Sequence, residues 1–147
     1  LAVPVITSGG TPSMMRTANA PVVSEYRPGT YVYNERSLVS LGVCSWADCA
    51  LTVLATVVSV PMENRAIIIA GSKALTSDLL GPQGHGHVLG HDDIAIDQLS
   101  GEHGRLLSSG PIGLAVGDKV RIVPAWSPTS LAPCFLPEPK ANSPYPP

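Results

Sequence analysis

The stretch Ser100–Pro124, SGEHGRLLSSGPIGLAVGDKVRIVP, decides the fold because it combines turn residues with a clear strand pattern. Polar and apolar side chains alternate over Lys119–Val123, which is typical of a strand with one solvent-facing and one buried side. The dipeptide Gly117-Asp118 comes directly before this run and supplies a turn. Upstream, the segment 94–99 (IAIDQL) is a second candidate strand. We therefore expect this part of the chain to form one wall of a small β-barrel.

Composition favours one soluble, mainly β domain. The 147 residues carry a formal net charge of −2 and are 44% hydrophobic but only 5% aromatic. The 14 glycines and 15 prolines interrupt the chain too often for long helices. The 9 Lys and Arg residues are scattered, whereas nucleic-acid binding needs them clustered. No apolar run approaches the roughly 20 residues of a membrane-spanning helix. We expect neither a nucleic-acid nor a membrane partner.

The cysteines indicate a reducing compartment. Cys44, Cys49 and Cys134 are odd in number, so they do not form a paired disulfide framework, and no secretion signal opens the chain. We therefore expect a cytoplasmic protein. Cys44 and Cys49 are too far apart for a CxxC motif, and we interpret them as small apolar side chains that are buried.

Residue composition divides the chain into three parts. Residues 1–24 hold an apolar run, a glycine-rich turn and a possible short helix, as at the end of an α/β unit. Residues 25–124 are rich in β-branched residues and turns, which predicts a β-domain. Residues 125–147 contain proline at short intervals, which predicts a polyproline-like or disordered tail. The predicted strands lie within 25–33, 50–60, 65–71, 94–99 and 119–123, with one or two helical turns within 37–49.

A glycine-rich loop follows the first apolar run. Ser8, Gly9, Gly10 and Thr11 combine two residues that lack a Cβ with hydroxyl donors on either side. Backbone amides in such a loop can turn inward, which makes these four residues candidates for a phosphate cradle. The alternative is an ordinary turn, since the loop is not a complete Walker motif.

Three histidines, His85, His87 and His91, are spaced as HxHxxxH. Alternate residues of a strand share a face and the third can fold back, so this spacing is compatible with a metal site. The alternative is an ordinary polar loop, since glycines flank His85.

Lys73 also has two interpretations. It is either a Schiff-base lysine or a solvated loop lysine, and the second is favoured because no neighbour in the sequence would activate the amine.

Seven segments, taken in order, resemble the C-terminal part of the D-threonine aldolase and D-serine dehydratase family. The members of this family are similar to pyridoxal-phosphate enzymes of the alanine-racemase fold type. The segments are TSGGTPS (7–13), EYRPGTYVYNER (25–36), GVCSWADCALTVLATVVS (42–59), RAIIIAGSKALTSD (65–78), HGHVLG (85–90), SGEHGRL (100–106) and VGDKVRIVP (116–124).

The resemblance implies an architecture and a cofactor. It implies a (β/α)8 barrel that carries pyridoxal phosphate, followed by a β-barrel-like domain, with dimerisation completing the active site. Residues 1–24 are then the last strand and loop of the (β/α)8 barrel. Ser8, Gly9, Gly10 and Thr11 match the family's phosphate loop. The tripeptide Glu102-His103-Gly104 matches a family signature whose chemical role the resemblance does not specify.

Two departures from the family pattern bear on activity. The family's Schiff-base lysine belongs to an earlier part of its barrel and has no counterpart here. A metal-binding His-x-Cys or His-x-Asp pair is replaced by Ala125-Trp126-Ser127-Pro128, so a divalent metal is doubtful. A truncated or frame-altered gene is a hypothesis that would account for the proline-rich tail in place of the family's ending.

We therefore expect the C-terminal portion of a lyase that depends on pyridoxal phosphate and a divalent metal and acts on D-3-hydroxy amino acids, as a D-threonine aldolase or D-serine dehydratase does, and we expect this portion to be inactive alone. Its expected partners are a missing barrel segment or a second copy of the chain, and a small D-amino acid as substrate. The alternative is a non-catalytic β-domain that serves as a binding or dimerisation module. A small metal protein built on His85, His87 and His91 is a third possibility.

Overall fold

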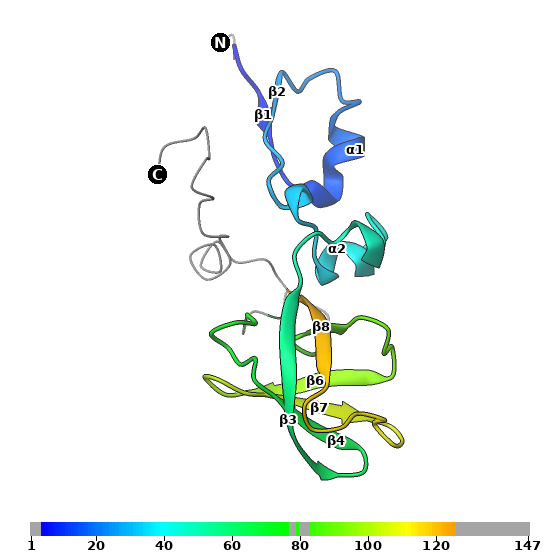
Figure 1. Ribbon diagram of the computed structural model, residues 1–147. Coiled ribbons are helices and arrows are strands. Elements are labelled where there is room, and N and C mark those ends of the chain that lie inside the picture. The colour runs from blue at the N-terminus through cyan, green and yellow to red at the C-terminus, as the bar shows by residue number, and fades with distance from the viewer. Residues whose placement is uncertain (1–3, 77–78, 80–82, 126–147) are drawn as a thin grey trace, which may run out of the picture.

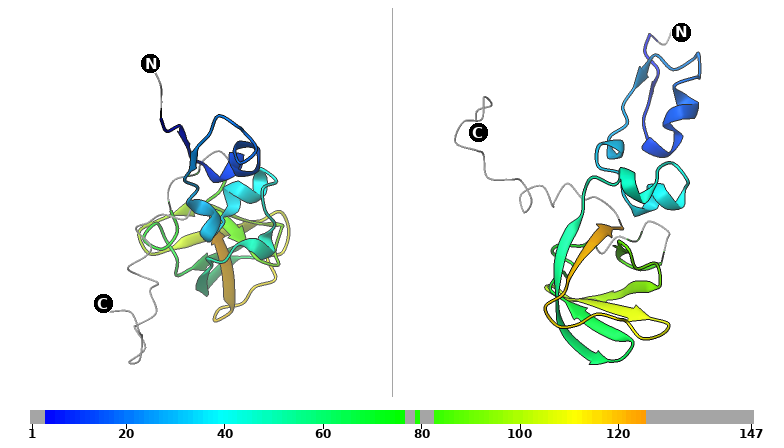
Figure 2. Two further views of the ribbon diagram at one scale, coloured as in Figure 1. Left: turned by 90° about the horizontal axis from the view of Figure 1, so that it is seen from above. Right: turned by 45° about the vertical axis from the view of Figure 1, so that its right-hand side comes forward.

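The computed structural model describes residues 4–76, 79 and 83–125, which form two regions (Figure 1). Residues 53–125 form a closed β-barrel. Residues 4–52, here called the N-terminal arm, contain only short helices and one pair of short strands. The arm extends from one end of the barrel in each of the side-on views (Figure 1 and Figure 2).

Within the described residues, the barrel closes in the strand order β3-β4-β7-β6-β5-β8, and all neighbouring strands are antiparallel. The pairing of Val53 with Ile122 joins the first strand to the last. A closed barrel leaves no unpaired strand edge. The strands are β3 (Val53–Met62), β4 (Arg65–Ile68), β5 (Gly86–Val88), β6 (Ile94–Leu99), β7 (Gly104–Ser108) and β8 (Lys119–Pro124). The mainly β, barrel-like fold is thereby confirmed.

Strand alternation directs one face of each strand into the barrel. In β3, Val53, Ala55 and Val57 are buried, whereas Leu54 between them is 64% exposed. The same alternation holds in β8 from Lys119 to Ile122, as the sequence predicts, whereas Val123 and Pro124 after it are both buried. The core cluster consists of Val53, Ala55, Val57, Ala66, Ile68, Ala70, Leu75, Val88, Ile94, Ile96, Leu106, Ile112, Val120 and Ile122.

Two predicted strands have different bounds in the structure. The strand expected within 65–71 ends at Ile68. The strand expected within 25–33 is reduced to β2 (Glu25–Tyr26), and a 3₁₀ helix, η2 (Thr30–Val32), follows it. Pro28 has no amide hydrogen for a strand ladder, so the β-formers after it do not extend β2. The domain boundary expected at residue 24 stays a prediction, and residues 126–147 of the expected tail lie outside the described residues.

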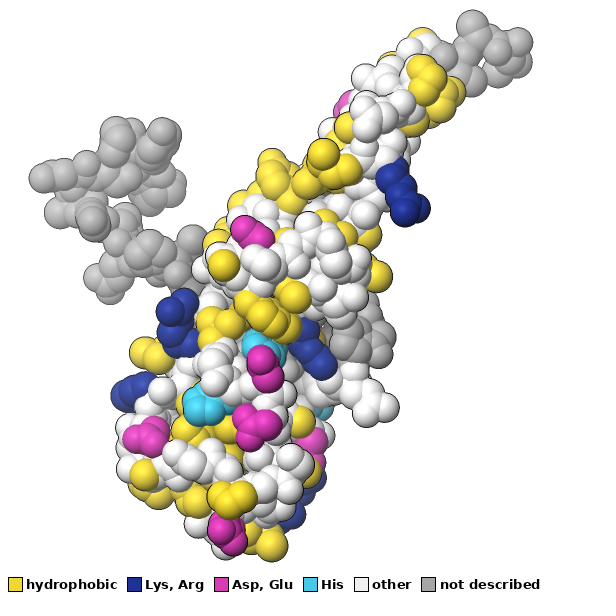
Figure 3. All heavy atoms as spheres, turned by 90° about the vertical axis from the view of Figure 1, so that its right-hand side faces the viewer, with side chains coloured by type: hydrophobic (Ala, Val, Ile, Leu, Met, Phe, Trp, Pro, Cys, Tyr) yellow, Lys and Arg dark blue, Asp and Glu magenta, His cyan; other side chains and the backbone are white. Residues whose placement is uncertain are grey.

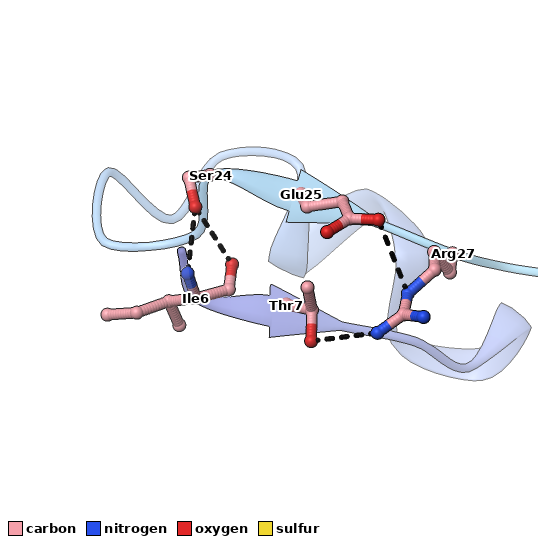
Figure 4. A network of polar contacts seen from close by, with 5 residues as sticks. All are labelled: Ile6, Thr7, Ser24, Glu25 and Arg27. Atoms are coloured by element: carbon pink, nitrogen blue, oxygen red, sulfur yellow. Dashed lines mark hydrogen bonds and ion pairs between the residues drawn. The ribbon is translucent and has the colours of Figure 1, made fainter. Parts of the chain in front are cut away.

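The arm begins with β1 (Thr7–Ser8), which pairs in parallel with β2. Polar side chains hold this pair together (Figure 4). The Ser24 hydroxyl accepts a 2.8 Å hydrogen bond from the Ile6 amide and donates one of 3.3 Å to the Ile6 carbonyl. Arg27 donates to the Thr7 hydroxyl at 3.1 Å and lies 3.5 Å from a Glu25 carboxylate oxygen. The pair is therefore stabilised mainly by hydrogen bonds.

Short helices make up most of the remaining arm. They are the 3₁₀ helix η1 (Thr11–Ser13), α1 (Met14–Thr17), α2 (Arg36–Ser40) and the 3₁₀ helix η3 (Trp46–Asp48). These confirm the short helix predicted before residue 24 and the helical turns predicted within 37–49. Ser45 and Asp48 form a capping box on η3. None of the helices in the described ranges has the length and apolar character that crossing a bilayer requires.

Among the described residues, the side chains of Arg36 and Trp46 join the arm to the barrel. Arg36 of α2 donates to the carbonyl oxygens of Gly84, at 2.6 Å, and Gln83. Trp46 of η3 stacks on His87 of β5, with ring centroids 3.8 Å apart and an interplanar angle of 9°. The Arg36 guanidinium and the stack of Trp46 on His87 thus fix the α2 end of the arm to the barrel.

Candidate functional site

The predicted phosphate loop directly follows β1 and depends on two glycines. Gly10 has φ 118° and ψ 111°, a conformation that residues with a Cβ rarely adopt. A Cβ on Gly9 would lie 3.0 Å from the Arg27 carbonyl oxygen, closer than ordinary van der Waals contact. The chain can therefore turn here, while β1 stays paired with β2, only because both side chains are absent.

Three successive amides of this loop make no hydrogen bond within the described part of the chain. The N–H groups of Gly9, Gly10 and Thr11 donate to no acceptor among the described residues. Thr11 is 3% exposed, and its hydroxyl oxygen accepts a 3.0 Å hydrogen bond from the Tyr31 amide. Free successive amides are the donors that bind anions in backbone nests. The loop thus retains donors for a phosphate group, while the Thr11 hydroxyl oxygen holds the loop to η2.

A cleft of about 460 Å³ adjoins the loop. Its lining comes from the loop with α1 and from the turn that follows α2. The lining residues are Thr11, Pro12, Ser13, Met15, Arg16, Leu41, Gly42 and Val43. The Arg16 guanidinium makes no hydrogen bond or ion pair with another described residue. Sequence reasoning missed Arg16 and the turn 41–43, because neither carries a motif and only the fold brings them beside the loop.

Lys73 is engaged in an ion pair on the surface. Its ammonium group contacts the Glu102 carboxylate, and the two side chains are 71% and 60% exposed. The hydrogen bond and the charge of Glu102 raise the pKa of Lys73 and lower that of Glu102. A Schiff-base lysine must lose its proton, so this pairing opposes such a role. The geometry agrees with the solvated-lysine interpretation.

The tripeptide 102–104 closes the hairpin between β6 and β7. Ser100 donates its amide to the His103 carbonyl at 2.8 Å, and its hydroxyl accepts from the His103 amide at 3.2 Å. A Cβ on Gly104 would lie 2.7 Å from the Ala70 carbonyl oxygen, and a Cβ on Gly71 would lie 2.4 Å from that of Ser100. The backbones of two loops therefore pack directly on each other, and this contact accounts for the glycine of the motif.

The three histidines occupy different environments. His87 stacks on Trp46, and its Nε2 lies 3.4 Å from an Asp92 carboxylate oxygen. The Nδ1 atom of His85 is buried without a hydrogen-bond partner in the described part of the chain. Burial lowers the pKa of His87, against the opposing effect of Asp92. Within the described ranges, no group of three or more His, Cys, Asp or Glu side chains is placed to hold a metal ion.

The cysteines of the described residues are free thiols. Cys49 is 8% exposed, and burial raises its pKa to about 11. Cys44 is half-buried, and burial raises its pKa as well. The predicted burial is confirmed for Cys49 and is wrong for Cys44, which is only partly buried. Cys134 and the Trp126-Ser127 dipeptide, which replaces the expected metal pair, lie outside the described residues.

Comparison with known proteins gives consistent relatives. Residues 50–132 match the family described as "Putative serine dehydratase domain". The chain is 33% identical over 119 residues to D-serine dehydratase from Dictyostelium discoideum, covering 71% of this chain and 30% of that protein. It is 30% identical over 131 residues to D-threonine aldolase from Arthrobacter sp., covering 85% of this chain and 33% of that protein.

Solved structures show the same arrangement. D-threo-3-hydroxyaspartate dehydratase from Delftia sp. HT23 superposes with a TM-score of 0.74 at 29% identity, covering 86% of this chain and 38% of that one. An alanine-racemase-like protein from Idiomarina loihiensis superposes with a TM-score of 0.73 at 24% identity, which supports the fold alone. The chain spans a fifth to a third of the length of the curated relatives that it matches. With its barrel, its glycine loop and these relatives in agreement, the chain belongs to the D-serine dehydratase and D-threonine aldolase family.

Proposed function

We propose that this chain is the C-terminal portion of a pyridoxal-phosphate-dependent lyase that acts on D-3-hydroxy amino acids. Within that portion, Ser8, Gly9, Gly10 and Thr11 bind the cofactor phosphate. The observation that carries the proposal is the row of amides at Gly9, Gly10 and Thr11 without an acceptor among the described residues, of which Thr11 lines a cleft, in a member of this family. When bound, pyridoxal phosphate supplies the electron sink that such lyase chemistry needs.

The loop fits a phosphate monoester for two reasons. The backbone conformation that leaves these amides without an acceptor in the described residues needs glycine, because a Cβ on Gly9 would lie 3.0 Å from the Arg27 carbonyl oxygen and Gly10 has φ 118°. Backbone amides are uncharged, so they also bind an anion without the desolvation cost of a cationic side chain. The Arg16 guanidinium lines the adjoining cleft and adds positive charge beside the bound group. The role of these residues is to hold and orient the cofactor, not to move a proton.

We infer that the covalent anchor comes from another polypeptide segment. Lys73 is paired with Glu102, and Lys119 donates to the Thr56 hydroxyl at 2.6 Å on the outside of the barrel. Neither lysine of the described residues is placed at the glycine loop. The described residues also provide no ligand set for a divalent metal, and we assign no step to one. We propose that the chain is inactive alone.

Features of the arm favour a partner that covers its exposed surface. The sheet β1-β2 has two strands only in the described residues, and parallel strands normally occur in sheets covered on both faces. Val5 and Val22, beside this sheet, are 53% and 63% exposed. A lysine-bearing barrel segment, or a second copy of the chain, would cover this surface. We further place the protein in the cytoplasm, where free thiols such as Cys49 persist.

A binding experiment tests the phosphate loop. Isothermal titration of the full chain with inorganic phosphate and with pyridoxal 5′-phosphate is expected to show binding. Gly10→Ala is expected to weaken binding at least about tenfold, because the new Cβ cannot adopt φ 118° without strain. Gly29→Ala is the matched control, since a Cβ there meets nothing within 4 Å and φ is −125°. Absence of binding to the unaltered chain, or equal binding by both variants, would overturn the proposal.

A second candidate function is a non-catalytic binding or dimerisation module. The observation in its favour is the barrel, which closes its own sheet and builds its core from its own strands and loops. Light scattering after size exclusion distinguishes the two functions. A dimer that does not bind phosphate supports the module, whereas lyase activity on co-expression with a lysine-bearing barrel supports the enzyme.

A further inference from the structure

The carbonyl oxygen of Gly10 is the most heavily hydrogen-bonded atom of the phosphate loop. It accepts from the Tyr26 hydroxyl at 3.1 Å, from the Ser13 amide at 3.2 Å and from the Ser13 hydroxyl at 3.3 Å. A carbonyl oxygen has two lone pairs, so three donors occupy it fully. The orientation of the Gly10–Thr11 peptide is therefore held from one side.

This orientation also sets the direction of a donor. A trans peptide unit is planar, so the Thr11 N–H points opposite to the Gly10 carbonyl. The donors on the carbonyl thus turn the Thr11 amide hydrogen away from Tyr26 and Ser13. That hydrogen meets no acceptor in the described part of the chain. The Thr11 hydroxyl, held by the Tyr31 amide, fixes the other side of the same residue.

Tyr26 differs from Ser13 in where it comes from. Ser13 belongs to the turn that it stabilises, whereas Tyr26 lies on β2 and is paired with Ser8 of β1. Glycine tolerates both signs of φ, so a peptide next to Gly10 can flip at little cost. A flipped peptide would present a carbonyl oxygen to the phosphate in place of an amide. A hydrogen bond from the neighbouring strand opposes that flip.

We propose that Tyr26 is a positioning residue of the phosphate loop, whose hydroxyl holds the Gly10 carbonyl so that the Thr11 amide is preoriented toward a phosphate monoester. The inference rests on the proposed function, because it assigns a role within the same loop. Tyr26 does not touch the phosphate itself. Its contribution is the preorganisation of a donor, which increases affinity without adding a contact.

The test is phosphate affinity of the full chain with one hydroxyl removed. Tyr26→Phe is expected to weaken binding of inorganic phosphate about three- to tenfold, the usual effect of one lost hydrogen bond. Tyr33→Phe is the matched control, because Tyr33 is 52% exposed and its hydroxyl has no partner among the described residues. The melting temperatures of both variants are expected to stay close to that of the unaltered chain.

Nuclear magnetic resonance separates positioning from general stability. In the unaltered chain, phosphate is expected to shift the Thr11 amide resonance downfield, and this shift is expected to shrink in Tyr26→Phe. Ser13→Ala keeps the Ser13 amide bond and is expected to weaken binding less than Tyr26→Phe does.

Each outcome is decisive. If the unaltered chain does not bind phosphate, the proposed function fails and the inference fails with it. If it binds and Tyr26→Phe binds within twofold of it, or if Ser13→Ala weakens binding more, the inference alone fails. A Thr11 shift that is equal in both proteins likewise overturns the role of Tyr26.

Discussion

The β-barrel and the N-terminal arm are stabilised in different ways. Every residue of the core cluster belongs to the barrel, and the closed sheet leaves no strand edge unpaired. In the arm, the buried residues are Thr11, Glu35, Leu38 and Cys49, of which half are polar. The hydrophobic effect thus dominates in one region and hydrogen bonding in the other. The two regions therefore differ in what stabilises them, and we expect the barrel to unfold independently of the arm.

The two surfaces show the same contrast. Figure 3 shows hydrophobic side chains along much of the arm, whereas Lys, Arg, Asp, Glu and His side chains gather mostly over the barrel. Monomeric soluble proteins rarely expose large contiguous apolar patches. The exposed apolar residues of the arm include Val5, Ile6, Met15, Val22, Tyr31, Val32, Tyr33 and Leu41.

The largest expected effect comes from removing core volume in the barrel. Ile96 of β6 is 0% exposed, so Ile96→Ala leaves a cavity and is expected to cost about 3 kcal/mol of unfolding free energy. Urea denaturation followed by far-ultraviolet circular dichroism measures this change. Leu38→Ala, at 2% exposure in α2, is the matched change in the arm. It is expected to leave the barrel transition unchanged, and a comparable loss of barrel stability would show that the two regions fold together.

The next effect concerns backbone packing between two barrel loops. Gly71→Ala is expected to cost about 2 kcal/mol, because its Cβ would lie 2.4 Å from the Ser100 carbonyl oxygen and backbone must move. Gly101→Ala, on the facing loop, meets nothing within 4 Å and is expected to change stability by less than about 0.5 kcal/mol. Thermal denaturation of both variants checks the difference. Similar melting temperatures for the two would contradict the close approach of these loops.

The junction between the regions is expected to respond to pH. Burial lowers the pKa of His87, Asp92 raises it and Arg36 lowers it, with burial the largest effect. The docked arm therefore favours neutral His87, so docking is complete above the ordinary pKa of 6.5 and weakens as the pH falls below it. Limited proteolysis of the arm between pH 5 and 8 measures docking.

Two variants separate the stack from the titration. Trp46→Ala is expected to weaken docking by about 1 kcal/mol at any pH, because the aromatic pair is lost. His87→Phe keeps an aromatic ring against Trp46 and is expected to remove the pH dependence. If His87→Phe remains as sensitive to acid as the unaltered chain, another group controls the junction.

The sequence predicted the barrel better than it predicted the junctions. Alternation over Lys119–Val123 and the β-branched run within 50–60 both correspond to observed strands, because burial of one strand face is a local property. The contact of Gly71 with the loop at Ser100 and the stack of Trp46 on His87 join residues far apart in the chain. No local pattern encodes such pairs.

The candidate site shows the same limit. The glycine loop at residues 8–11 is visible in the sequence, because the absence of side chains is itself a signal. The role of Tyr26 is not visible, since a tyrosine in a strand usually serves packing. Arg16 lines the cleft only because the fold places α1 beside it. For Lys73, the ion pair with Glu102 favours the solvated-lysine interpretation over the Schiff-base one.

The smallest expected effect lies on the outside of the barrel. Arg105 of β7 donates to both carboxylate oxygens of Asp97 of β6, at 2.9 and 2.7 Å. These hydrogen bonds lower the pKa of Asp97, so the pair stabilises the fold fully above the ordinary value of 3.8, and the contribution is lost as the pH falls through the lower folded value. The side chains are 33% and 28% exposed, so Asp97→Asn is expected to cost only about 0.5 kcal/mol at pH 7. Urea denaturation at pH 7 and pH 3, with and without added salt, measures this. A loss above about 2 kcal/mol that salt does not reduce would mean that surface ion pairs, and not only the apolar core, distinguish the barrel from the arm.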